Sequence, residues 1–221
     1  MKLSTIFSQL ETSELNQLSC IDTSTGKIRP EKYQAIVDML NQGLVDLHTR
    51  FKLKVGTVTV PIDPAVGTYD LSKFDPNVKG RFLQLHDVRD ECDRVLPTGG
   101  FGGHHINFIS SMQMVVPENL RTVYPVRQVI VQYRALPTRI GDCFGDIDPE
   151  YVDVDLPVPY IWALCLYVAS RLHTPVGLQD GTYRVNAFLG LYNAECTRLK
   201  DENVELDYQQ DMGHLRRGGW A

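Results

Sequence analysis

Two short stretches of the sequence contain side chains that could do chemistry, and the first is TGGFGGHHIN at residues 98–107. His104 and His105 follow a glycine-rich turn there, but the GK[ST] ending of a phosphate-binding loop is absent. Neighbouring histidines point to opposite sides of a strand, and no second pair of ligands stands at metal spacing. We therefore expect a hairpin tip or contact loop, with Phe101, His104 and His105 as its contact residues.

The second stretch is GDCFGDIDPEYVDVD at residues 141–155. Asp146, Asp148 and Glu150 alternate as calcium ligands can, but the glycine and the distal glutamate of a calcium-binding loop are absent. Cys143 follows an acidic residue, which does nothing to stabilise a thiolate. The pattern is typical of a solvated turn that leads into an alternating strand.

No catalytic motif accompanies these stretches, because the sequence contains neither a GxSxG nucleophile elbow nor an HExxH zinc motif. The sequence thus predicts no catalytic residue, no cofactor and no metal, and the protein is not expected to be an enzyme. Side chains that are distant in sequence can still converge in space, so a small α+β hydrolase stays open as an alternative. Its candidate residues are His104, His105, Asp146 and Asp148.

Charge and cysteine content limit the partners and the compartment. The chain has 221 residues and a formal net charge of −5, which argues against a surface that grips nucleic acid through clustered Lys and Arg. Its five cysteines form no CxxC pair, a pattern that suits a reduced cytoplasm better than a disulfide framework.

Helical patterns occupy the ends of the chain and strand patterns its middle. Apolar residues recur at three- and four-residue steps after Pro30, and again from about Gly181 to about Lys200. Between them the period is two, and VGTVTVPI followed by TYDL indicates a hairpin. We expect an α+β fold with three parts. They are a helical bundle of residues 1–53 and 156–203, an antiparallel β-rich insertion at 54–155, and an extended C-terminal tail at 204–221.

The most hydrophobic segment is PVPYIWALCLYVASRLHTP at residues 157–175. It is shorter than the roughly 20 apolar residues that span a bilayer, so we expect a helix buried by protein and no membrane segment. Both of its faces are apolar and need partners, as does a broad face of the last helix, where Leu191 and its neighbours are expected inward. The side chains expected to pack in the bundle or between subunits are Trp162, Leu166, Tyr167, Phe188 and Tyr192.

The order of these parts resembles the head-to-tail adaptor, or connector, proteins of tailed bacteriophages. The resemblance rests on a helix followed by FKLKVGTVTVPI, on TYDL, on VIVQYRALPTRI, and on an acidic strand before LPVPYIWALCLYVASR. It covers most of residues 30–200 and consists of packing patterns rather than catalytic signatures. TYDLS replaces the proline form of the family pattern, and GGFGGHH has no counterpart in it.

The resemblance implies a structural protein of the virion neck or tail, assembled in the cytoplasm of the bacterial host. Family members form closed homo-oligomeric rings, usually of twelve copies, that bind below the portal protein and let double-stranded DNA pass without sequence recognition. A tail-tube or nozzle protein binds below, and Phe101, His104 and His105 would contact a neighbouring ring or this tail component. In the family an extended C-terminal tail reaches the portal. The corresponding anchors here are Leu215, Arg216, Arg217 and Trp220.

Three alternatives stay open on the sequence. The tail can dock on its own or a neighbouring subunit instead of the portal. The apolar helix can be covered by ring neighbours or by its own bundle. The protein can also be a tail-tube or tail-completion protein of the same particle.

Overall fold

The computed structural model describes residues 1–12, 20–22, 24–100, 104–123, 125–141, 148–172 and 180–202. It consists of helices and antiparallel sheets, which confirms the predicted α+β class. Neither of the sheets in the described residues closes into a barrel. The predicted tail at 204–221 lies outside the described residues.

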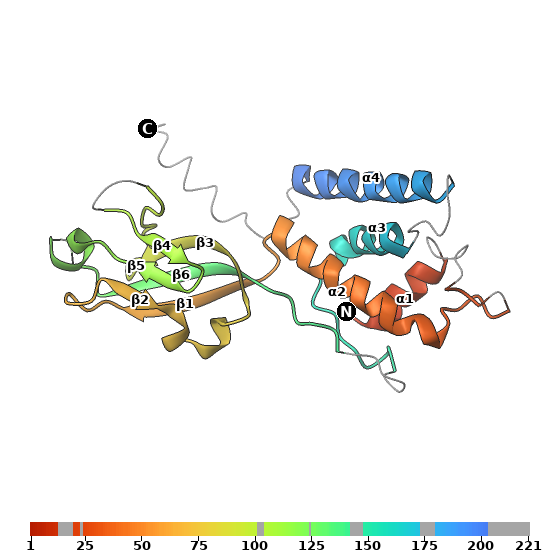
Figure 1. Ribbon diagram of the computed structural model, residues 1–221, viewed down its shortest axis with the longest axis horizontal. Helices are drawn as coiled ribbons and strands as arrows, with labels where there is room; N and C mark the ends of the chain where they lie inside the picture. Colours follow the sequence, from red (N-terminus) through yellow and green to blue (C-terminus); the bar gives the residue numbers. More distant parts are fainter. Residues whose placement is uncertain are drawn as a thin grey trace. The chain divides into compact units, whose positions relative to one another are not determined.

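Contacts divide the chain into two units, shown in Figure 1. The helical unit joins Met1–Leu53 to Pro137–Ala221, and the β unit is Lys54–Leu136. Both ends of the chain therefore build the helical unit, and the β unit is inserted into it.

The insertion ends at residue 136, earlier than the position 155 that the sequence indicates. Val154 and Leu156 are buried in the core of the helical unit. The predicted strand EYVDVDL joins no sheet and forms only an isolated bridge between Lys2 and Asp153. An extended segment that lies on helices buries every second side chain, just as a strand does, so the period of two misled the interpretation.

The helical unit contains α1 (Leu3–Thr12), α2 (Tyr33–Arg50), α3 (Ile161–Leu172) and α4 (Asp180–Asp201). Prolines begin two of these helices, because short 3₁₀ turns at Pro30–Lys32 and Val158–Tyr160 lead into α2 and α3. Among the helices that the structure describes, none has both the length and the apolar character to cross a bilayer.

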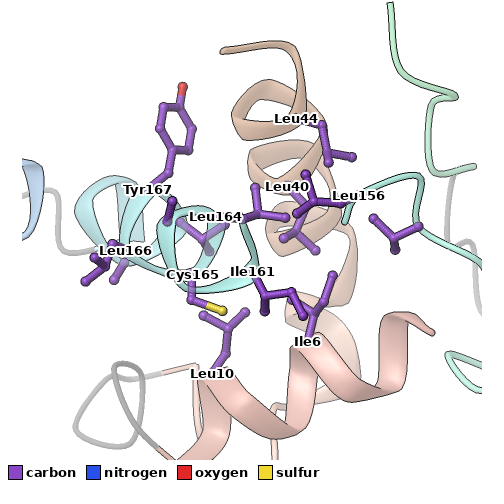
Figure 2. Close-up of a cluster of buried hydrophobic side chains, with 14 of the residues drawn as sticks. Ile6, Leu10, Leu40, Leu44, Leu156, Ile161, Leu164, Cys165, Leu166 and Tyr167 are labelled. Carbon is purple, nitrogen blue, oxygen red and sulfur yellow. The ribbon is translucent and has the colours of Figure 1, made fainter. Parts of the chain in front are cut away.

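Helix α3 lies at the centre of the bundle, in contact with α1, α2 and α4. Nine of its 12 residues are buried, including Ser170. In Figure 2, Leu164 points toward Leu40 of α2 and Cys165 toward Leu10 of α1. The apolar segment is thus covered within one chain, and the burial of α3 needs no ring neighbour.

Most of the side chains expected to pack in the bundle or between subunits are in this core, whereas Trp162 and Leu191 are exposed. Leu166, Tyr167 and Tyr192 are buried, and Phe188 is partly buried against them. Trp162 is 38% exposed and so lies outside the buried core of its own chain, although its neighbours Ile161 and Ala163 are buried. Leu191 is 53% exposed, because α4 packs on α3 along one side only and buries a narrower face than its sequence suggests.

A close approach between α2 and α3 depends on Gly43. A Cβ atom at this position would lie 2.6 Å from Leu164 Cδ1 and 2.8 Å from Tyr167 Cδ1. Gly43→Ala is therefore expected to lower the free energy of unfolding by about 1–3 kcal/mol, as over-packing of a core does. The control is Gly190→Ala on α4, where no atom lies within 4 Å and the better helix propensity of Ala should stabilise by up to about 1 kcal/mol. Urea unfolding measures the free energy of unfolding of both variants. Equal changes in the two variants would contradict the close packing of α2 on α3.

The described residues of the β unit form two three-stranded antiparallel sheets, with strand orders β1-β6-β3 and β2-β5-β4. Its strands are β1 (Val55–Pro61), β2 (Thr68–Asp70), β3 (Phe82–Asp90), β4 (Asn107–Ser110), β5 (Gln113–Val115) and β6 (Gln128–Ala135). The predicted hairpin of VGTVTVPI with TYDL is wrong, because β1 pairs with β6 and β2 with β5. The alternating segment INFISSMQMVV forms the β4–β5 hairpin.

Candidate functional site

The base of the histidine loop is held by backbone hydrogen bonds. Ile106 N–H donates to the Pro97 carbonyl at 2.9 Å, and Gly99 N–H donates to the Ile106 carbonyl at 3.1 Å. His104 is exposed and His105 is half-buried, whereas Phe101 lies outside the described residues. The described part of the loop therefore has a fixed base and an exposed His104, which suits a contact loop.

The acidic stretch is only partly described, because Cys143 and Asp146 lie outside the described residues. The Asp148 carboxylate accepts a hydrogen bond from Glu150 N–H at 3.0 Å and so stabilises a turn. Within the described residues no three His, Cys, Asp or Glu side chains come together as metal ligands would. Asp146 belongs to both the calcium-like pattern and the hydrolase alternative, and it lies outside the described residues.

A polar cluster that the sequence did not reveal joins α2 to α4. The Tyr192 hydroxyl donates a hydrogen bond to Asp46 Oδ2, and Arg50 Nε donates to the same oxygen at 2.7 Å. The Arg50 guanidinium lies 5.1 Å from the centre of the Tyr192 ring and also donates to Asn193 Oδ1 at 3.3 Å. The spacing of Asp46 and Arg50 suggests a helical ion pair, but no pattern in the sequence indicates that Tyr192 completes it.

This cluster can hold α4 against α2. Burial, together with the hydrogen bond to Asp46, raises the pKa of Tyr192 above that of a free tyrosine. Burial also raises the pKa of the neighbouring Cys196 thiol, which makes it a poorer nucleophile. The arrangement can therefore fasten α4 to α2.

The raised pKa of Tyr192 makes stability depend on alkaline pH. The unfolded tyrosine loses its proton near pH 10.0, whereas the folded one keeps it to higher pH. The contribution of Tyr192 to the free energy of unfolding is thus fully present below pH 10. As the pH rises further, this free energy falls by up to about 1.4 kcal/mol per pH unit. Tyr192→Phe should flatten this alkaline loss in urea unfolding. Tyr151→Phe, which changes an exposed ring, should leave it as in the wild type, and equal slopes for all three proteins would contradict the assignment.

The tip of the hairpin that follows β3 is rigidly built. The Asp90 carboxylate, 2% exposed, accepts hydrogen bonds from Cys92 N–H and Arg94 N–H, both at 2.9 Å, and from Arg94 Nε at 2.7 Å. Burial alone would raise the pKa of Asp90, but these hydrogen bonds outweigh it and lower the pKa. Asp93 adopts a φ of 62°, a conformation that this tight turn requires.

Two exposed apolar side chains belong to the start of α3. Val158 lies in the 3₁₀ turn that leads into the helix and is 71% exposed, and Trp162 lies in the first turn of the helix itself. On the described surface of the helical unit this pair is a candidate for contact with another protein. The predicted portal anchors Leu215, Arg216, Arg217 and Trp220 lie outside the described residues.

Comparison with known proteins assigns the chain to no family. No family model matches its sequence, and no curated protein sequence is significantly similar to it.

Proposed function

We propose that the protein is the head-to-tail adaptor of a tailed bacteriophage, a structural virion protein rather than an enzyme. Copies of the chain, usually twelve in this family, form a ring that binds below the portal protein and presents a platform for the tail tube or nozzle. Double-stranded DNA passes through the central channel without sequence recognition, and the acidic balance of the chain suits a channel that does not hold phosphates.

One observation carries this proposal: a helical unit built from both ends of the chain contains a β unit of 54–136. This is the order of parts on which the resemblance to adaptor proteins rests. The exposed Trp162 and Val158 support it, since a ring repeats one contact around an axis and needs apolar surface outside the subunit core. The exposed His104, with His105 beside it, suits contact with a neighbouring ring or tail component.

Electron microscopy and sedimentation of the purified protein, with and without portal particles, test this function. We expect ring-shaped density on the portal. The variant Trp162→Glu should keep the wild-type melting curve and lose the ring, because Trp162 lies outside the buried core. A protein that stays monomeric and does not bind portal particles would overturn the proposal.

A further inference from the structure

Strand β1 lies at one end of the strand order β1-β6-β3, and β6 is its only hydrogen-bonded neighbour among the described strands. The Lys54 carbonyl accepts from Ala135 N–H, and Ile62 N–H donates to the Arg127 carbonyl, both at 2.9 Å. Antiparallel ladders alternate, so the even-numbered residues of β1 bond to β6 and the odd-numbered ones turn their N–H and C=O groups away.

The outward groups belong to Val55, Thr57 and Thr59, which are all exposed. In the part of the chain that the structure describes, no hydrogen bond reaches the backbone N–H or C=O of these three residues on this side. Pro61 has no N–H and closes the open stretch at its far end. The stretch is therefore five residues long, from Val55 to Thr59, with Thr57 at its centre.

The other edge strands carry the features that prevent strand addition. The pairing of β3 with β6 is interrupted by two register shifts, and β3 carries the ion-paired Asp87 and Arg89. The end of β3 is covered as well, because Leu96 N–H donates to the Val88 carbonyl at 2.7 Å. Strand β2 has three residues, and β4 has a register shift. In contrast, β1 pairs with β6 over seven residues without a shift and carries no charged side chain.

We propose that β1 is a self-pairing site, where β1 of a second copy adds antiparallel with Thr57 on the two-fold axis. In this register Thr57 faces Thr57 of the second copy, and Val55 faces Thr59 of the second copy. Every outward N–H and C=O of the open stretch then meets a partner. The facing side chains are all β-branched and uncharged, and such cross-strand pairs stabilise a sheet.

This contact goes beyond the adaptor function and does not depend on it. A two-fold contact is complete with two copies, whereas a ring repeats a head-to-tail contact around its axis. The β1 contact therefore joins two free subunits, or two whole assemblies, and it is separable from ring formation.

The decisive variant is Thr57→Pro. It removes an N–H that points outward and leaves every bond between β1 and β6 intact, so the fold is expected to survive. Sedimentation should show that Thr57→Pro halves the mass of the wild-type species. Thr57→Val keeps the N–H and should keep the wild-type mass, whereas Val58→Pro breaks the ladder to β6 and should unfold the β unit. An unchanged mass for folded Thr57→Pro overturns the proposal.

A charge exchange at the axis tests the register separately. Thr57→Lys alone, and Thr57→Glu alone, should each have half the wild-type mass at low salt, because like charges face each other across the axis. An equal mixture of the two should recover the wild-type mass. Either charged variant at full mass by itself, or a mixture that does not recover, overturns the two-fold axis at Thr57.

Discussion

Leu166→Asp is expected to abolish the folded helical unit. Leu166 is 1% exposed on α3, in a core that α1, α2 and α4 also build. An aspartate there would place a carboxylate without a partner among apolar side chains, at a cost of several kcal/mol. Since a domain is stable by only about 5–15 kcal/mol, the variant should lose its cooperative unfolding transition and become insoluble. Circular dichroism and urea unfolding measure the effect.

The matched control is Leu191→Asp on α4, the same chemical change at an exposed site. The helical pattern predicts Leu191 to be inward, whereas the structure leaves it exposed. The free energy of unfolding of this variant should therefore lie within about 0.5 kcal/mol of the wild-type value. Soluble, cooperative Leu166→Asp would contradict the central position of α3. If Leu191→Asp is unfolded, Leu191 is buried as the sequence pattern predicts, and its exposure in the structure is wrong.

The sequence predicts elements better than it predicts their partners, and α2 shows why. Its buried residues Ile36, Leu40 and Leu47 follow the three- and four-residue spacing that identifies the helix. Spacing is a local property, and it reports which face is apolar. Helix α4 shows the limit of this signal. The width of the face that a helix buries depends on how many other helices pack against it, and local spacing does not report how many do.

Strand pairing in the β unit shows the same limit more strongly. Alternation locates β1 correctly, but the hairpin expected from it is absent because Val58 and Val60 pair with Val131 and Val129, far along the chain. We attribute this pairing to the burial of these side chains against the second sheet, and no short stretch of sequence encodes that contact. Likewise, Asp46 and Arg50 suggest an ion pair from their spacing, whereas the contribution of Tyr192 becomes visible only when α4 is placed.

The candidate site is harder to predict than the fold, for a physical reason. A contact surface needs a few aromatic or arginine side chains and has no spacing rule. Trp162 was expected in the packing of the bundle or between subunits because it is apolar, yet it is its exposure that makes it a contact candidate. The open edge of β1 was also invisible in the sequence, because an edge strand and a central strand can have the same alternation.

Deletion of the chain from about Leu206 onward is expected to weaken portal binding sharply while the subunit stays folded. The described core of the helical unit reaches only to Leu199, and α4 ends at Asp201, so the melting temperature should change little. Trp220 and the Arg216/Arg217 pair are removed, and side chains of these types dominate contact energies.

The expected size of this effect is large because the ring acts as a unit. Loss of one central anchor costs at least about 2 kcal/mol, or about 30-fold in affinity, and simultaneous binding by many copies multiplies the loss. Co-sedimentation with portal particles measures it for the full-length chain, the truncated chain and Trp220→Ala, with Trp220→Phe as the control that keeps an aromatic ring. Trp220→Ala should retain part of the binding because the arginines remain. Equal co-sedimentation of the truncated and full-length chains would remove the tail from the portal contact, and the exposed start of α3 would then be the next surface to change.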